Sequence, residues 1–298
     1  MRYFHAVRLD QERCTGCTNC IKHCPTEAIR VQSGKAYIIE ERCVDCGVCI
    51  RVCPNHAKFA HTDSLSALEN YTYNVALPAP ALFGQFSELS DPKQVLDALI
   101  TLGFDAVFEV PRAADLISQA MRDFIKTAGA GPWISASCPA VVRLIQVRFP
   151  ELIPNLIPIE SPMEVAGFLA RALAQQETGL ISEDIGVWFI TPCPAKVTAI
   201  YQPEALHHSN VSGAIAISQI YGDLLRLLPE QASSSSIWCA SGYGLGWGRA
   251  GGETLAVGIA NHLSVDGIEH LIPLLEELEM GRLRDIAFLE CQACVGGC

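Results

Sequence analysis

The sequence predicts two domains, a small cysteine-rich α+β module followed by a larger α/β domain. A cysteine pattern is duplicated within the first 53 residues, and short apolar segments alternate with amphipathic ones after about residue 70, as in a sheet covered by helices. The polar stretch 61–66 separates the two regions. A length of 298 residues allows about two domains. We therefore expect the module to span residues 1–62 and the α/β domain residues 70–298.

Composition limits the classes of partner. Asp and Glu outnumber Lys and Arg by 32 to 21, giving a net charge of −11. The sequence has no cluster of Lys and Arg that would bind the phosphates of nucleic acid. No apolar run reaches the roughly 18 residues of a membrane span, and the N-terminus lacks the apolar segment of a secretory signal. We expect a cytoplasmic protein that neither binds nucleic acid nor crosses a membrane.

The chain has 14 cysteines, and eight of them lie within the first 53 residues. In a reducing compartment this density indicates metal binding rather than disulfides. The pattern Cys-x-x-Cys-x-x-Cys-x-x-x-Cys-Pro begins at Cys14 and again 29 residues later at Cys43. Paired zinc sites are the alternative, but zinc does not need the third close cysteine and the Cys-Pro. The spacing resembles that of bacterial two-cluster ferredoxins.

That resemblance implies two 4Fe-4S clusters, each with three close cysteines and a fourth from the other repeat. The first cluster would be held by Cys14, Cys17, Cys20 and Cys53, and the second by Cys43, Cys46, Cys49 and Cys24. A hairpin strand is expected at 36–39, between the repeats. A module this small has little core of its own, so its clusters are expected to hold it together.

In the larger region, strands are predicted at 73–77, 106–110, 133–135, 187–191 and 286–289. Helices are predicted at 94–102, 114–128, 140–148, 162–176, 215–228, 254–262 and 267–279. The helix after Ser161 has a clear start, because Ser161, Pro162 and Glu164 form a capping box. A glycine-rich loop at the active site is expected at 246–251.

Three cysteines of this region directly follow predicted strands. Cys138, Cys193 and Cys294 each lie just past a strand, and the carboxyl ends of parallel strands share one edge where ligands bind. With Cys298 they are therefore candidates for one cluster. Ordinary buried cysteines are the alternative, but they would not account for three strand-then-cysteine boundaries. Cys239 has no such pattern and is expected to be structural.

The three cysteine segments resemble the motifs of the iron-only (FeFe) hydrogenases, in the family's order. Residues 135–139, Ser-Ala-Ser-Cys-Pro, are similar to Thr-Ser-Cys-Cys-Pro, and residues 191–196, Thr-Pro-Cys-Pro-Ala-Lys, to Met-Pro-Cys-x-x-Lys. Residues 290–298, Glu-Cys-Gln-Ala-Cys-Val-Gly-Gly-Cys, are similar to Glu-x-Met-Ala-Cys-x-x-Gly-Cys. The larger domain thus resembles the family's catalytic domain, preceded by its usual ferredoxin-like module.

The resemblance implies an H-cluster, a 4Fe-4S cube bridged to a diiron subsite that carries CO and cyanide. Its cube would be held by Cys138, Cys193, Cys294 and Cys298, with Cys298 as the bridge. Lys196 would donate a charge-assisted hydrogen bond to a cyanide, and Ser137 would occupy the proton-donor position. The remaining cofactor-pocket residues on this resemblance are Ala79, Pro80, Ser161, Thr191 and Gln292.

Several positions depart from the family pattern. Ser137 replaces the proton-donating cysteine, and a hydroxyl is a poorer relay than a thiol with a pKa near 8.5. Ala199 stands where the family has a relay glutamate, and the acids of the preceding helix correspond to Ala120, Met121 and Phe124. Thr191 and Gln292 replace methionines, and Cys291 adds a thiol. The usual proton path is thus expected to be missing.

The sequence is compatible with three functions. The protein would interconvert protons, electrons and H2 slowly, sense H2 or redox state, or act without catalysis as an electron carrier or cluster scaffold with three 4Fe-4S clusters. A ferredoxin-like protein or a flavoprotein is the expected redox partner. The family continues beyond the position of Cys298 into a glycine-rich segment, so we expect the sequence to be truncated there.

Overall fold

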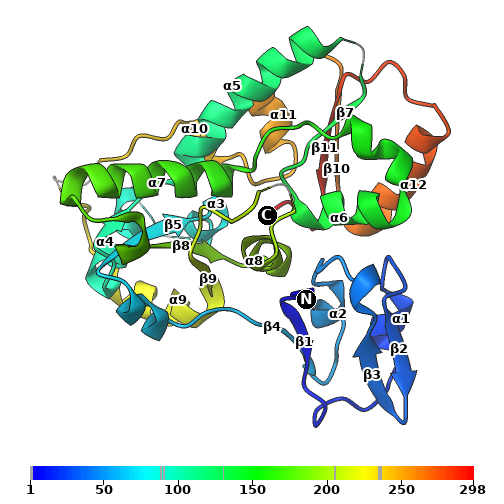
Figure 1. The fold of residues 1–298 in the computed structure, drawn as a ribbon, viewed down its shortest axis with the longest axis horizontal. Helices are drawn as coiled ribbons and strands as arrows, with labels where there is room; N and C mark the ends of the chain where they lie inside the picture. Colours follow the sequence, from blue (N-terminus) through cyan, green and yellow to red (C-terminus); the bar gives the residue numbers. More distant parts are fainter. Residues whose placement is uncertain (1–2, 88, 90, 130, 205, 234–236) are drawn as a thin grey trace.

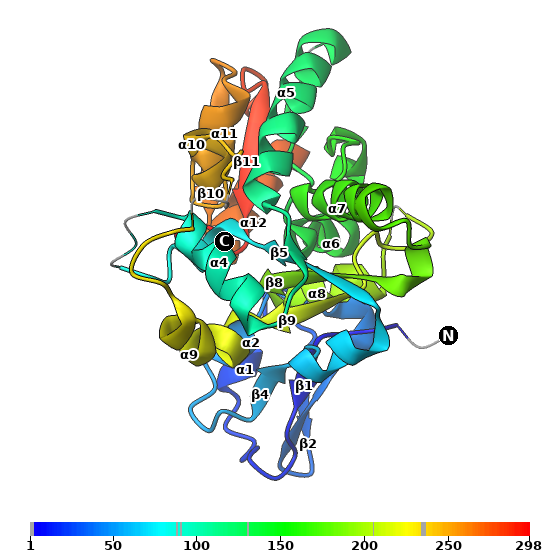
Figure 2. The ribbon, with the colours of Figure 1, turned by 90° about the vertical axis from the view of Figure 1, so that its left-hand side faces the viewer.

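A computed structural model describes residues 3–87, 89, 91–129, 131–204, 206–233 and 237–298 (Figure 1). The cysteine-rich module lies beneath the large domain in both ribbon views (Figures 1 and 2). This arrangement agrees with the predicted order of an iron–sulfur module and an α/β domain. In the described ranges, no helix combines the length and apolar character needed to cross a bilayer.

The module consists of two short antiparallel strand pairs and two one-turn helices. Strand β1 (Val7–Leu9) pairs with β4 (Lys58–Ala60), and β2 (Ile29–Gln32) pairs with β3 (Lys35–Ile38). Helices α1 (Asn19–Lys22) and α2 (Val48–Arg51) follow equivalent cysteine loops of the two repeats. The hairpin strand predicted at 36–39 is therefore observed, shifted by one residue.

One sheet of the large domain has the order β6-β5-β8-β9, with every strand parallel to its neighbour. Its strands are β5 (Tyr73–Pro78), β6 (Ala106–Val107), β8 (Ile185–Thr191) and β9 (Gly213–Ala216). Because side chains alternate along a strand, Val75 and Val187 pack towards α7 (Pro162–Thr178), whereas Trp188 packs towards α4 (Lys93–Leu102) and α9 (Ile217–Leu227). Both faces are covered, as expected for a parallel sheet.

A second parallel sheet has the order β10-β11-β7. Its strands are β7 (Trp133–Ile134), β10 (His262–Asp266) and β11 (Phe288–Gln292). The core containing α6 (Pro139–Arg148) and α12 (Ile268–Glu279) covers one face, and the core containing α5 (Val110–Ala128) and α11 (Gly252–Val257) covers the other.

Short helices α3 (Pro80–Phe83), α8 (Pro194–Tyr201) and α10 (Gly242–Leu245) complete the domain. Short 3-10 segments occupy Glu40–Arg42, Leu65–Asn70, Pro150–Asn155 and Ser182–Asp184.

Some predicted elements differ from the structure. The expected single sheet is two sheets, and the helix predicted from 215 begins only at Ile217, because β9 occupies Gly213–Ala216. The helix predicted at 254–262 ends at Val257, and β10 begins at His262. The strand predicted at 106–110 ends at Val107, since α5 begins at Val110. These strands are short, and their apolar residues do not alternate with polar ones, so the sequence pattern did not separate them from the neighbouring helices.

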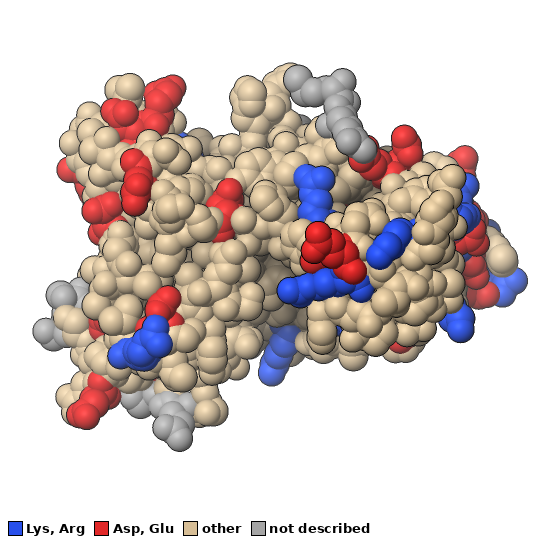
Figure 3. Space-filling model, turned by 90° about the horizontal axis from the view of Figure 1, so that it is seen from below, with Lys and Arg blue, Asp and Glu red and all other residues tan. Residues whose placement is uncertain are grey.

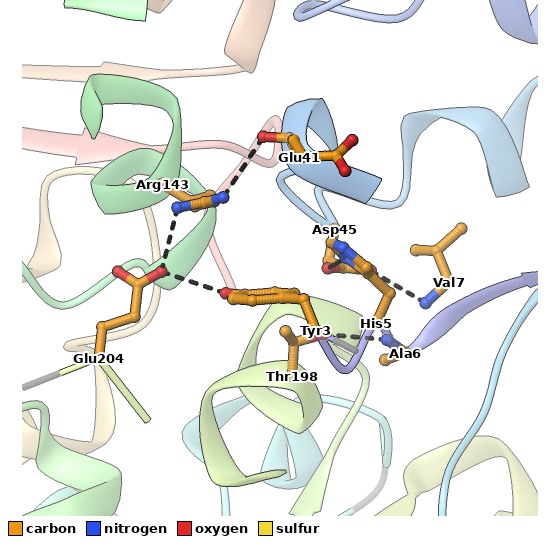
Figure 4. Close-up of polar contacts among 9 residues, drawn as sticks. All are labelled: Tyr3, His5, Ala6, Val7, Glu41, Asp45, Arg143, Thr198 and Glu204. Atoms are coloured by element: carbon orange, nitrogen blue, oxygen red, sulfur yellow. Dashed lines mark hydrogen bonds and ion pairs between the residues drawn. The ribbon is translucent and has the colours of Figure 1, made fainter. Parts of the chain in front are cut away.

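The chain start and the second cysteine loop contact the large domain (Figure 4). The Ala6 amide donates to Thr198 Oγ1 at 3.0 Å, and Arg143 donates to the Glu41 carbonyl at 3.3 Å. Tyr3 and Arg143 both reach Glu204. On the module side of the molecule, Lys and Arg side chains are interspersed with Asp and Glu (Figure 3).

The connection between the domains is fixed by Asp63. Its amide donates to the Ala214 carbonyl, and its carboxylate accepts from the Ala214 amide at 2.7 Å and from the Tyr201 hydroxyl at 2.6 Å. Asp63 thereby extends the edge of the four-stranded sheet next to β9. The polar stretch predicted as a linker is thus partly built into the large domain.

Replacing Asp63 with Ala should destabilise the protein. The substitution leaves the Ala214 amide and Tyr201 hydroxyl without their acceptor, which costs about 1–3 kcal/mol of unfolding free energy. Denaturant unfolding of the large domain, followed by tryptophan fluorescence, measures this loss. The exposed Asp123 of α5 is the matched control, because Asp123→Ala should change the unfolding free energy by no more than about 0.5 kcal/mol. Equal effects of the two substitutions would contradict this role of Asp63.

Candidate metal centres

A cavity lies where the two sheets of the large domain meet. Cys138 and Cys193 are the N-cap residues of α6 and α8, and a proline follows each at the first helical position. The cavity is bordered by residues that follow β5, β7 and β8, by the loop before α11, and by β11 and the chain end. Its lining includes the predicted residues Ala79, Pro80, Ser137, Cys138, Thr191, Cys193, Lys196, Gln292 and Cys298.

The last residues of the described chain are held by backbone contacts. The Cys298 amide donates to the Gly248 carbonyl at 2.6 Å, and the Ala250 amide donates to the Gly296 carbonyl at 3.0 Å. Gly297 has a φ of 106°, and a Cβ there would lie 2.3 Å from the Gly248 oxygen, so this approach requires glycine. The chain end at the centre of Figure 1 is therefore fixed against the glycine-rich loop, as expected for a cavity wall.

Cys294 lies between this cavity and the module. It is absent from the cavity lining, yet its thiol interacts electrostatically with those of Cys138 and Cys298 and also with that of Cys46. Gly47, next to Cys46, packs closely against Pro194: a Cβ built on Gly47 would lie 3.3 Å from Pro194 Cγ. The structure therefore brings the four cysteines predicted for the third cube into one neighbourhood, directly beside the second cysteine loop.

The other predicted site residues divide into two groups. Ala79, Pro80, Thr191 and Gln292 line the cavity. Ser161 does not, because its hydroxyl accepts from the Glu164 amide at the start of α7 and it lines a neighbouring, larger cavity. The family resemblance placed Ser161 in the pocket, but in this structure its polar group caps a helix.

Lys196 points into the cavity from the first turn of α8. Its Nζ donates to the Ser137 carbonyl at 3.2 Å and lies 5.9 Å from the centre of the Phe189 ring. An ammonium with a single carbonyl partner retains donors for a further acceptor. The side chain is thus placed to bind an anionic group in the cavity.

Two carboxylates are buried at this site: Glu253, which the sequence reasoning missed, lines the cavity, and Glu290, which it quoted only as part of the third motif, lies near Glu253. Glu253 Oε1 accepts from Ser135 Oγ at 2.6 Å and from Ser137 Oγ at 3.2 Å, and the two serine hydroxyls are 2.8 Å apart. Glu290 accepts from the backbone amides of Gly251 and Thr254 at 2.8 Å. The family's usual proton path was expected to be missing because its acids are replaced; Glu253 is an acid from a different element, α11, that lies beside Ser137.

The environment makes Glu253 an unusual carboxyl group. Burial is the main reason why its pKa is raised to about 8; the neighbouring Glu290 also raises the pKa, whereas hydrogen bonds from the two serines and the charge of Lys196 lower it. The group is therefore mainly protonated at neutral pH and exchanges a proton near that pH. A charged residue following two glycines in an otherwise apolar segment was the only sequence signal, and no motif explained it.

The donors of the large-domain cavity fit a thiolate-bound metal cluster. Burial raises the pKa of Cys193 to about 12 and that of Cys294 to about 11, so without a metal these thiols stay neutral. Iron reverses this preference, since it binds the thiolate and supplies the compensating charge. Gln292 Oε1 is also buried without a hydrogen-bond partner among the described residues.

The module contains two further cavities, each lined by one predicted ligand set. The first is bordered by Cys14, Cys17, Cys20 and Cys53, and the second by Cys24, Cys43, Cys46 and Cys49. Backbone amides donate to sulfur from Ala28 to Cys24, Ala36 to Cys14 and Ala57 to Cys53, at 3.2–3.3 Å. Amide donors to sulfur suit clustered thiolates, and both cavities therefore fit 4Fe-4S cubes.

Comparisons with known proteins agree with this geometry. Residues 72–222, half of the chain, match the C-terminal domain of the iron-only hydrogenase large subunit, and residues 6–54 match a 4Fe-4S dicluster domain. The chain belongs to the iron-only hydrogenase family. Its fold is thus a ferredoxin-like dicluster module followed by the α/β domain of these hydrogenases.

Curated relatives include both hydrogenases and cluster-assembly factors. The periplasmic Fe hydrogenase large subunit of Nitratidesulfovibrio vulgaris is 29% identical over 220 residues, covering 67% of this chain and 52% of the relative. HndD, a subunit of the NADP-reducing hydrogenase of Solidesulfovibrio fructosivorans, is 27% identical and covers 69% and 34%. The cytosolic Fe-S cluster assembly factor NAR1 of Scheffersomyces stipitis is 27% identical and covers 41% and 25%. The chain spans about half the length of the first relative and less of the others.

Solved structures support the fold. A variant of the FeFe-hydrogenase HydA1 from Chlamydomonas reinhardtii has a TM-score of 0.56 at 15% identity and covers 77% of this chain and 81% of that one. HydA(deltaEFG), from a study of stepwise H-cluster assembly, has a TM-score of 0.57 at 14% identity, with the same coverage. At this identity the likeness concerns the arrangement of the backbone.

Cluster binding by the large domain can be tested by removing one thiol. With three cubes the reconstituted protein should bind about twelve irons, and Cys193→Ala should bind about eight while the module's signals remain. The exposed Cys239 is the control, because Cys239→Ala should retain about twelve. The exposure of Cys239 also shows that its thiol is not part of the core, contrary to a structural role. Iron and sulfide analysis that finds about twelve irons in Cys193→Ala would contradict the third cube.

Proposed function

We propose that this member of the iron-only hydrogenase family interconverts protons, electrons and H2 at the large-domain cavity, at a low rate that suits sensing of H2 or redox state. The observation that carries the proposal is the combination of buried thiols with Lys196 and with the polar chain from Ser137 to Glu253. A site used only to store a cube needs neither an ammonium in its wall nor a carboxyl group that titrates near neutral pH.

The proposed ligands follow the three cavities. Cys14, Cys17, Cys20 and Cys53 would hold the first cube, Cys24, Cys43, Cys46 and Cys49 the second, and Cys138, Cys193, Cys294 and Cys298 the third, with Cys298 also bridging to a diiron unit. Such an H-cluster supplies the metal that exchanges electrons with H2 and protons. Lys196 would bind its cyanide as a charged hydrogen-bond donor.

The proposed proton route runs through residues of this chain. Glu253 holds a proton that Ser135 and Ser137 can pass on, since their hydroxyls lie 2.8 Å apart. Ser137 precedes Cys138 and borders the cavity. A hydroxyl must give up one proton before or while it accepts another, and its low acidity makes this slower than transfer through a thiol. Slow turnover follows from the serine rather than from the lack of an acid.

Electrons would pass between the third cube and the outside through the module. The second cavity adjoins Cys294 through Cys46, while Cys17 of the first cavity is exposed. A soluble redox partner, ferredoxin-like or a flavoprotein, would therefore meet the module at the first cavity. The density of free thiols favours a reducing compartment, the cytoplasm.

A second candidate is an electron carrier or cluster scaffold with three cubes and no diiron unit. The cluster-assembly relatives favour it, as do Thr191, Gln292 and Cys291, which make the cavity wall more polar than the family's methionines would. Lys196 favours the H-cluster, because a cube alone has no cyanide to bind.

Infrared spectroscopy of protein matured with the diiron precursor separates the two candidates. The H-cluster proposal expects CO and cyanide bands in the parent and weakened or absent bands in Lys196→Met, since the cyanide loses its charged donor. The exposed lysine Lys126 of α5 offers the matched control, Lys126→Met, which should keep the parent spectrum. A parent with three cubes but without these bands would favour the carrier.

The proton route predicts a large effect of Glu253→Gln on turnover. Amide replaces acid with little change in shape, so H2 evolution should fall by about 10²–10⁴-fold. In the parent, the rate should fall as pH rises through about 8, where Glu253 loses its proton, and the variant should lack this inflection. Ser137→Cys should raise the rate.

Glu160→Gln is the control for this experiment. Glu160 lines the neighbouring cavity, and burial raises the pKa of its carboxyl too, but it is not among the residues that line the cavity of Ser137. Turnover should therefore be near that of the parent. If Glu160→Gln lowers turnover as much as Glu253→Gln does, protons enter through that cavity instead.

A further inference from the structure

The two cysteine repeats differ in charge at equivalent positions. With the 29-residue offset, Ile29 of the first repeat corresponds to Lys58 of the second, and Gly16 corresponds to Asp45. Because each fourth cysteine crosses over, Lys58 lines the first cavity and Ile29 the second. The duplication therefore provides two similar cavities whose walls carry different charges.

Lys58 is a buried cation whose Nζ has no hydrogen-bond partner in the described part of the chain. The residue is 3% exposed. It lies in β4, opposite Leu9 of β1, where the repeat has the equally buried Ile29. An ammonium out of water requires a compensating charge. The nearest candidates are the thiolates and sulfides of a cluster in the first cavity.

Electrostatic effects on the thiols agree with this position. Burial raises the pKa of Cys20, and the Lys58 ammonium opposes the rise. For Cys53, burial raises the pKa, but backbone hydrogen bonds and the same ammonium lower it overall. Both cysteines belong to the first cavity. Burial also raises the pKa of Cys49 in the second cavity to about 12, again against the effect of Lys58.

The second cavity has a carboxylate instead. Asp45 accepts from the Val7 amide at 3.0 Å, and its Oδ2 lies 2.6 Å from His5 Nδ1 (Figure 4). The Asp45 carboxylate also lies close to the Cys43 thiol. A carboxylate with a neutral imidazole carries one negative charge, and a carboxylate with an imidazolium carries none. In neither state does the pair add a positive charge to the second cavity. Lys58 lines the first cavity and not the second, although its charge also reaches Cys49.

We propose that Lys58 raises the reduction potential of the first cluster above that of the second, so that a single electron in the module rests on the outer cluster. A positive charge stabilises the reduced, more negative cluster, most strongly at short range in a medium of low dielectric constant. The step is a one-electron transfer that oxidises the second cluster and reduces the first.

This inference rests on the proposed ligand sets, and it predicts the direction in which electrons pass through the module. The second cavity adjoins Cys294 and the first has the exposed Cys17. Electrons released at the large-domain site would therefore run downhill to the module's outer side. That direction suits oxidation of H2, or its detection, rather than H2 evolution.

The test is a reductive titration of the full chain, loaded with its 4Fe-4S cubes but without the diiron unit, followed by electron paramagnetic resonance. Loss of one signal in Cys17→Ser assigns the first cluster. In the parent, this cluster should be reduced first. Lys58→Met should shift its potential to a more negative value, and Lys58→Arg, which keeps the charge, should shift it less.

Ile29→Lys is the mirror-image variant and should raise the potential of the second cluster. If Lys58→Met loses the first cube, Lys58→Arg and Ile29→Lys still decide the question. A first cluster that is reduced after the second in the parent would overturn the proposal, as would an unchanged second-cluster potential in Ile29→Lys. The diiron unit takes no part, so failure here is distinct from failure of the infrared test.

Discussion

The burial of thiols governs this structure, because nearby cations such as Lys58 and Lys196 oppose its effect on the thiol pKa values only in part. Burial raises the pKa of Cys46, Cys49 and Cys193 to about 12, and such groups become thiolates at neutral pH only when a metal supplies positive charge. The local backbone serves the same end. Gly47 adopts a positive φ angle within the second cysteine loop, and the amide of the next residue, Val48, donates to the Cys46 sulfur. The module has little other core, so on the proposed assignment its stability would depend on its clusters.

The large domain places its site between two sheets rather than along the edge of one. β8 delivers Cys193 from the first sheet, and β7 and β11 deliver Cys138 and Cys294 from the second. A cavity between two separately packed cores is bounded by backbone on several sides, which limits access of water. The wall is completed by the contact of Cys298 with Gly248, in which glycine allows a close backbone approach.

The sequence predicted the module, the order of the main elements and the grouping of cysteines, because these depend on spacing and on periodic apolar residues. It did not predict β9, whose four residues, Gly-Ala-Ile-Ala, run directly into α9. Glu253 was missed for another reason. Its partners Ser135 and Ser137 lie more than 110 residues away, and no local pattern records such a contact. Ser161 shows the converse, since its local capping signal was correct while its placement in the cofactor pocket relied on resemblance alone.

On the proposed assignment, protons and electrons reach the site from different sides. Glu253 belongs to α11 and approaches through the serines before Cys138, whereas the second cavity approaches through Cys46 and Cys294. The arrival of an electron at the third cube can therefore affect the proton route only through electrostatic interaction across the cavity. A reduced cube adds negative charge near Glu253, and added negative charge favours its protonated form. Reduction of the third cube would thus retain the proton on the very acid that delivers it, so that arrival of an electron and readiness of a proton are linked by electrostatics rather than by movement of the fold.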